Sequence, residues 1–159
     1  MKVITKLRDR RLHYEALDQV LELAVLLNED MTEALARDGL TVARAPVVWH
    51  LYHSGPCTQR ALANALGVTP RNITGLVDGL AATGFVSRQP HPTDRRATLV
   101  TLTDHGRQTA ARLTAERDEL AALLFAEMSD TEFDGFVAGL GVVLDRIRAE
   151  LARTRGARQ

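Results

Sequence analysis

Apolar residues recur with a helical period over the first part of the chain. Between Arg10 and Arg37 there is neither proline nor glycine, and apolar side chains return every three or four positions. This stripe consists of Leu12, Ala16, Val20, Leu23, Leu27, Met31 and Ala34. A second set widens it: Leu17, Leu21, Val25 and Leu35. Such a wide stripe predicts a long helix that is buried on more than one side and ends near Gly39.

The end of the chain repeats this pattern. One helix is predicted from about Asp104 to Met128. A second follows Ser129-Asp-Thr-Glu132, a capping box in which serine and glutamate satisfy each other's backbone donors. The apolar face of the second helix holds Phe133, Phe136, Val137, Leu140, Val143, Leu144, Ile147 and Leu151. We expect the residues from Arg153 onward to be frayed.

Caps and helix breakers divide the middle of the chain into shorter elements. Thr58 caps a predicted helix over Gln59 to Leu66, and Thr69 caps another that starts at Pro70 and closes at Gly84. Between the caps, Ala63, Gly67 and Ile73 have the spacing of a helix-turn-helix, in which glycine permits the left-handed turn. Such a unit presents one face of its second helix to the DNA major groove. That face holds Arg71, Asn72, Thr74, Gly75 and Asp78.

Alternating residues predict a hairpin after this unit. The strands are Phe85 to Gln89 and Thr98 to Leu102, joined by a loop at His91 to Arg96. Before the unit, a helix lies within Thr41 to His53, and Pro46 either marks a later start or bends it. The expected fold is therefore mainly α with a small β-hairpin wing.

Composition narrows the possible functions. The 159 residues carry 20 basic and 20 acidic side chains, which argues against a polycation that coats nucleic acid. Yet residues 55–103 hold five arginines and two aspartates, a local charge of +3. No apolar run could span a membrane, the start does not read as a secretory signal, and a single cysteine cannot form an internal disulfide. These features favour a cytoplasmic protein without membrane association.

The residue types on the predicted interface suit double-stranded DNA. Arginine reads guanine and asparagine reads adenine through paired hydrogen bonds, which assigns Arg71 and Asn72 to base edges. Thr69 and the helix start suit phosphate, and Thr74 lies on the same face. On the wing, one of Arg95 and Arg96 is expected to enter the minor groove, and Asp94 would hold the loop by accepting backbone or arginine hydrogen bonds.

The chain resembles the MarR (multiple antibiotic resistance regulator) family of winged helix-turn-helix transcriptional regulators from about Leu12 to Leu151. The similar motifs are Asp94-Arg95-Arg96, Leu102-Thr103 with Gly106, the stretch from Thr58 to Pro70, and that from Gly79 to Val86. The resemblance implies one MarR-like chain over 1–159. Its dimerisation helices would lie at 10–38 and 104–153, and its winged helix-turn-helix domain at 41–103.

The same resemblance implies a homodimer that presents two recognition helices about 34 Å apart to a near-palindromic site. It also implies a cleft for a small aromatic or other small-molecule effector. His13, Tyr14, Trp49, Tyr52 and His53 are the candidates to line it, although packing in the core or at an interface is the favoured explanation for these residues. Of the two wing arginines, Arg96 is the one that stands at the position of the arginine in the family's wing motif.

Three residues depart from the family pattern. Gly75 and Gly79 stand where relatives often carry polar or basic side chains, and each costs the helix about 1 kcal/mol relative to alanine. Pro46 stands where relatives continue a helix. These glycines support an alternative function, a winged-helix module for protein interactions that no longer binds DNA.

Other chemistry finds little support in the sequence. His50 and His53 are spaced like a metal-binding pair, but no third ligand accompanies them, so neither a metal nor another cofactor is expected. Cys57 reads as a structural thiol more than as a reactive one. No catalytic residue set occurs, so no enzyme is expected. The resemblance therefore implies a sequence-specific DNA-binding transcriptional regulator, with a ligand-responsive repressor as the favoured form.

Overall fold

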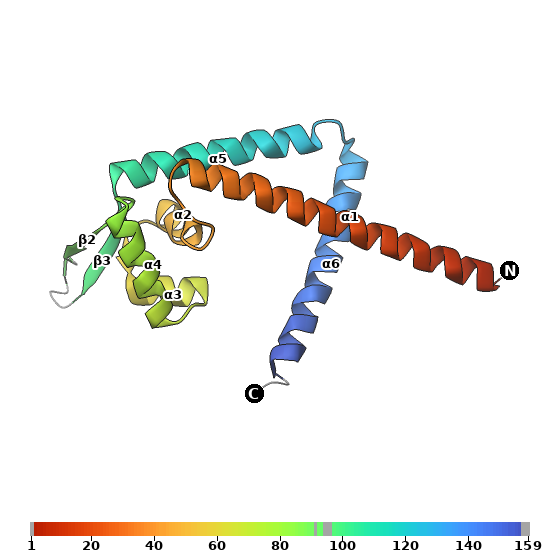
Figure 1. Cartoon of the computed structure of the whole chain (residues 1–159), viewed down its shortest axis with the longest axis horizontal. Coiled ribbons are helices and arrows are strands. Elements are labelled where there is room, and N and C mark those ends of the chain that lie inside the picture. Colours follow the sequence, from red (N-terminus) through yellow and green to blue (C-terminus); the bar gives the residue numbers. More distant parts are fainter. Residues whose placement is uncertain (1, 91, 94–96, 157–159) are drawn as a thin grey trace. The chain divides into compact units, whose positions relative to one another are not determined.

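The computed structural model describes residues 2–90, 92–93 and 97–156 (Figure 1). The elements follow in the order α1 (Lys2–Arg37), α2 (Ala45–Ser54), β1 (Cys57–Thr58), α3 (Gln59–Leu66), α4 (Pro70–Ala82), β2 (Val86–Pro90), β3 (Thr98–Leu102), α5 (Asp104–Phe125) and α6 (Asp130–Gly156). Helices dominate, and one small antiparallel sheet completes the described part, as predicted. Two compact units, Met1–Thr114 and Ala115–Gln159, divide the chain.

The sheet has the strand order β1-β3-β2. The predicted hairpin is present, with Val86 opposite Leu102 and Arg88 opposite Val100. The first hairpin strand begins one residue later than predicted, because the Phe85 amide donates to the Leu80 carbonyl at 2.9 Å and belongs to the turn that closes α4. Strand β1 was not predicted. It has only two residues, too few to show alternation, and it exists through pairing with β3, where Cys57 faces Val100.

The core of the first unit lies where α2, α3 and α4 meet the sheet. Its fully buried side chains include Phe85, Leu35, Leu62, Ile73, Leu80, Val47, Val48, Val77 and Val100. Burying one such side chain contributes about 1.5–3 kcal/mol. These contacts fix α4 against α3 and the sheet, which sets the direction of its outer face.

Helix α1 joins this core only near its C-terminal end. Leu35 is buried, whereas most of the large apolar residues from Leu12 to Leu27 are exposed. The helix also begins earlier than the predicted Arg10, at Lys2. It ends in a left-handed Gly39 (φ 72°), and the Leu40 amide donates back to the Leu35 carbonyl at 3.0 Å.

Helix α2 begins late enough for Pro46 to lie in its first turn. The Arg44 and Ala45 amides both donate to the Thr41 carbonyl at 2.9 Å, so a turn precedes the helix. The helix starts at Ala45, with Pro46 in its first turn, where no intrahelical donor is required. The later start is therefore confirmed, and the helix is not bent at the proline.

In the second unit, the predicted capping box is present. The Ser129 amide donates to Glu132 Oε2 at 2.9 Å, and the Glu132 amide to Ser129 Oγ at 3.4 Å. Hydrogen bonds from Ser129 hold the pKa of the Glu132 carboxyl below its usual value. The preceding helix ends at Phe125 and not at Met128, whose amide closes a tight turn on the Phe125 carbonyl at 3.1 Å.

The expectation of a frayed tail was wrong as far as Gly156. Helix α6 continues to that residue, and its last turns carry local side-chain bonds. Arg153 Nη2 lies 2.5 Å from Glu150 Oε2, and the Thr154 hydroxyl donates to the Glu150 carbonyl at 3.0 Å. Side-chain pairs three or four residues apart stabilise a helix end, and these two contacts account for the continued helix.

Candidate nucleic-acid interface

Two threonine caps set the geometry of the helix-turn-helix. Thr58 Oγ1 accepts from the Ala61 amide at 3.2 Å, and Thr69 Oγ1 accepts from the Asn72 amide at 3.2 Å. Between them, Gly67 adopts φ 63°, a left-handed conformation that costs glycine little. The predicted caps and turn are confirmed, and they fix where α4 begins.

Helix α4 has a buried face and an exposed face. Ile73, Val77 and Leu80 are buried in the core. The outer face consists of Arg71, Asn72, Thr74, Gly75 and Asp78, all exposed. These are the residues that the sequence placed there, so the structure brings the four expected DNA-contacting residues from Thr69 to Thr74 onto one surface.

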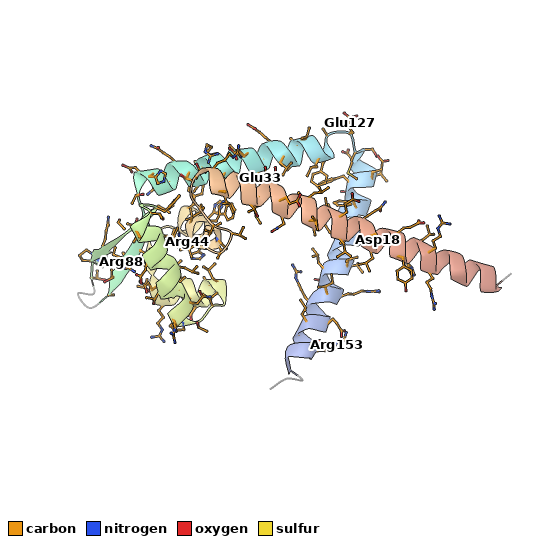
Figure 2. The ribbon with its side chains drawn as sticks, in the orientation of Figure 1. Asp18, Glu33, Arg44, Arg88, Glu127 and Arg153 are labelled. Carbon is orange, nitrogen blue, oxygen red and sulfur yellow. The ribbon has the colours of Figure 1, made fainter. Side chains whose placement is uncertain are left out.

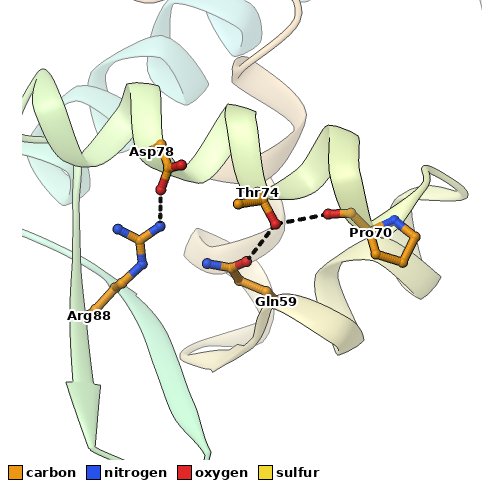
Figure 3. A network of polar contacts seen from close by, with 5 residues as sticks. All are labelled: Gln59, Pro70, Thr74, Asp78 and Arg88. Atoms are coloured by element: carbon orange, nitrogen blue, oxygen red, sulfur yellow. Dashed lines mark hydrogen bonds and ion pairs between the residues drawn. The ribbon is translucent and has the colours of Figure 1, made fainter.

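Thr74 is also tied to the neighbouring helix. Its hydroxyl lies 3.1 Å from Gln59 Oε1 and 2.9 Å from the Pro70 carbonyl oxygen (Figure 3). A hydroxyl has a single hydrogen, so it donates to one of these oxygens at a time. Thr74 therefore helps to hold α3 against α4 in addition to lying on the exposed face.

An ion pair that the sequence reading missed lies on the same surface. Asp78 of α4 pairs with Arg88 of β2 (Figure 3). Both side chains are substantially exposed, so the pair contributes little to stability. Its effect is electrostatic, since the arginine neutralises the one acidic residue on the exposed face of α4. The sequence shows two opposite charges, but only the fold brings the strand beside the helix.

The starts of α3 and α4 differ in charge from those of α5 and α6. The first turns of α3 and α4, both fully described, contain no acidic residue. Each has an arginine as its second residue, Arg60 and Arg71, and both arginines are exposed. By contrast, α5 starts with Asp104, and α6 has acidic residues in its first turn. A cation at a helix start is unfavourable unless an anion approaches.

The base of the wing is held by Thr103. Its hydroxyl donates to the Gly84 carbonyl at 2.6 Å and accepts from the Gly106 amide at 3.0 Å. Its amide donates to the Phe85 carbonyl at 3.0 Å. A Cβ on Gly106 would overlap that carbonyl oxygen, so a side chain does not fit there. This network explains the Leu102-Thr103 and Gly106 motif. Asp94, Arg95 and Arg96 lie outside the described residues.

The expected effector residues do not form one cleft within a single chain. Trp49 and Tyr52 pack against the core, and the Tyr52 ring meets the ring of the exposed His53 edge-on at 5.3 Å. His13 and Tyr14 lie on α1, about 30 Å along the helix from the turns that reach the core. Both side chains are exposed.

An open hollow of about 460 Å³ lies elsewhere on α1, lined by Asp30, Glu33, Ala34, Ala36 and Arg37. Its two carboxylates, from Asp30 and Glu33, disfavour any ligand that carries a negative charge. Cys57 lies against the core, and burial raises the pKa of its thiol. A raised pKa disfavours the reactive thiolate.

The fold and the exposed recognition helix define the class of winged helix-turn-helix DNA-binding proteins. The model of the MarR family matches residues 40–98. The transcriptional repressor YetL of Bacillus subtilis is 29% identical over 130 residues, which cover 80% of this chain and 78% of YetL. The transcriptional regulator Mb0904 of Mycobacterium bovis is 30% identical over 115 residues, covering 72% of this chain and 80% of Mb0904.

Solved structures agree on the fold. The S. aureus MepR–DNA complex superposes with a TM-score of 0.68 at 21% identity, covering 79% of this chain and 95% of MepR. The chain belongs to the MarR family of transcriptional regulators. Its curated relatives are named as transcriptional regulators, which is a non-enzymatic role. Among the described residues, no helix is long and apolar enough to cross a membrane.

Proposed function

We propose that this protein is a homodimeric, ligand-responsive repressor that binds a near-palindromic operator. The observation that carries the proposal is the exposed face of α4, where Arg71 and Asn72 project from a helix fixed by its cap and its buried side. In this function Arg71 and Asn72 contact base edges, while Thr69 and Thr74 lie against the backbone. One of Arg95 and Arg96 extends the contact into the minor groove, and Asp94 braces the wing loop.

The charge distribution around α4 supports this use of its surface. Arg88 compensates Asp78, and the exposed Arg60 and Arg71 stand at helix starts that lack acidic residues. DNA phosphates supply the anion that such helix starts favour. The neutral chain thus has a locally cationic face, which suits a regulator that selects one site better than a protein that coats DNA.

The homodimer rests on apolar residues that the single chain leaves exposed. On α1 these are Leu12, Leu17, Leu21, Leu23, Val25, Leu26 and Leu27, and on α6 they include Val137, Val143, Leu144, Ile147 and Leu151. Exposed apolar surface on this scale is typical of a protein interface. We assign residues 10–38 and 104–153 to dimerisation and residues 41–103 to DNA binding. Two-fold symmetry then predicts two matching half-sites.

An effector would act by changing the separation of the two recognition helices. Trp49, Tyr52 and His53 are candidates to contact it because the Tyr52 ring contacts the exposed His53 imidazole and Trp49 lies one turn before His53 on the same helix. His13 and Tyr14 join such a cleft only if the second copy brings its α1 there. A small aromatic molecule is the ligand class that these rings favour.

The experiment is a selection of binding sites from a random duplex library, followed by fluorescence-anisotropy titrations over a range of salt concentrations. We expect one near-palindromic sequence to emerge, with an affinity that falls steeply as salt rises, because phosphate contacts release counterions. Sedimentation analysis should give a dimer. Recovery of no preferred sequence would reject the proposal and favour a protein-interaction module.

A further inference from the structure

The Arg44 side chain occupies the space beside Gly79 of α4, which explains why this position is a glycine. Glycine in a helix interior is unfavourable relative to alanine, so its presence calls for a reason. A Cβ built on Gly79 would overlap the Nη2, Cζ and Nε atoms of Arg44. At Gly75, one turn earlier, the same atom meets nothing within 4 Å among the described residues. Gly79 is therefore the seat of the Arg44 guanidinium on α4.

Arg44 comes from a different element, the residue that immediately precedes α2 (Figure 2). It is half-buried, and within the described residues its guanidinium has no acidic partner. The acidic residue of α4, Asp78, is paired with Arg88 instead. The Arg44 guanidinium therefore places a positive charge, without an acidic partner in the described part of the chain, against α4, the helix that we propose binds DNA.

The seat lies on the same flank of α4 as an expected base contact. Gly79 follows Asn72 by seven residues, which is almost two full turns, or about 10 Å along the helix axis. A helix in the major groove has a row of phosphates along each flank. A guanidinium held at Gly79 is therefore placed beside the groove wall when Asn72 faces the bases.

We propose that Arg44 is a DNA-backbone contact that α2 supplies to the recognition helix, and that Gly79 is required to seat it. This inference rests on the proposed use of α4 for DNA binding. The guanidinium takes the place of the polar side chain that position 79 lacks. The competing explanation is purely structural: a cation near the last turn of α4 favours the helix dipole without touching DNA.

The two explanations differ in the salt dependence of binding. With the selected operator duplex, Arg44→Ala should lower affinity roughly tenfold, the effect of losing one charged hydrogen bond. It should also reduce the slope of log K against log salt by about 0.9, the share of one phosphate contact. Arg44→Lys should retain the slope because the charge remains. Arg117→Ala, an exposed arginine of α5, is the control for the change in net charge.

Gly79→Ala makes the sharper test. It removes no charge and should not lower the melting temperature, because alanine favours the helix and the displaced atoms end a flexible side chain. It should nevertheless weaken operator binding, and it should have no further effect in an Arg44→Ala background.

An unchanged salt slope in Arg44→Ala would overturn the proposal, as would an equal effect of Gly79→Ala with and without Arg44. Arg71→Ala separates these results from a failure of the proposed function. If Arg71→Ala weakens operator binding and Arg44→Ala does not, α4 reads DNA without Arg44. If the unmodified protein selects no operator, both proposals fail.

Discussion

Arg112 of α5 forms an ion pair with Asp38, in the turn that follows α1. The pair therefore links α5, which follows β3, to the turn between α1 and α2. Its carboxylate is well covered, with the Asp38 side chain 19% exposed. If the arginine is removed, the covered Asp38 carboxylate loses its ion-pair partner and is not fully hydrated by water in its place.

Arg112→Ala is therefore expected to lower the free energy of unfolding by about 1–3 kcal/mol. Arg107→Ala, an exposed arginine on the same helix, serves as the control and should change stability by less than about 0.5 kcal/mol. Urea denaturation followed by circular dichroism measures both. Equal effects of the two substitutions would show that the ion pair contributes nothing specific.

Gly106→Ala should destabilise the winged domain. The added Cβ would overlap the Phe85 carbonyl oxygen, and a backbone atom inside a hydrogen-bonded turn cannot move aside as a flexible side chain can. We expect a loss of about 1–3 kcal/mol, the usual cost of overpacking. Gly75→Ala is the matched control and should gain up to about 1 kcal/mol, because no atom of the described residues lies within 4 Å of the added Cβ. Thermal unfolding that moves in the same direction for both variants would contradict this account.

Substitutions of the Asp78–Arg88 pair should have opposite effects on DNA binding. Asp78→Asn removes a negative charge from the recognition surface and should strengthen binding at low salt. Arg88→Ala exposes that charge to the phosphates and should weaken it. Stability should change by no more than about 1 kcal/mol in either variant, since the pair is exposed. Anisotropy titrations at two salt concentrations test this, and a loss of affinity in both variants would instead indicate a structural role.

The capping box of α6 should contribute a pH-dependent stability. The folded pKa of Glu132 lies below its ordinary value, 4.5. The unfolded chain therefore binds this proton more readily, and the contribution is present above the ordinary pKa and disappears as pH falls through the folded pKa. Glu132→Gln removes the effect, so the melting temperatures of the two proteins should converge as the solution is acidified. A constant difference down to the lowest pH would contradict the assignment. Ser129→Ala should behave like Glu132→Gln.

The elements that the sequence predicted well are those governed by neighbouring residues. The caps at Thr58 and Thr69 and the left-handed Gly67 each act within a few positions, so α3 and α4 were placed to the residue at their starts. Strand β1 could not be found in this way, because Cys57 becomes a strand residue only beside Val100. The proposed assignment of the terminal helices to a second copy of the chain rests on family similarity, because local patterns show only that these helices have wide apolar stripes.

In the candidate site too, only the features set by neighbouring residues could be predicted from the sequence. The exposed face of α4 follows from helical periodicity, which separates Arg71 and Asn72 from the buried Ile73. The partners of that face do not, because Arg88 and Arg44 arrive from elements that are distant in sequence. Gly79 looked like a missing side chain, and only the structure supplied the arginine that fills its place.

The exposed stripe of α1 has a consequence for how the protein folds. Most of the large apolar residues from Leu12 to Leu27 of α1 are exposed, so this long helix gains little from packing unless the proposed second copy covers them. In the proposed dimer, folding and association would form one equilibrium, and the melting temperature should rise with protein concentration. The amount of regulator in a cell would thus set both the occupancy of its DNA site and the fraction of its own chains that are fully folded.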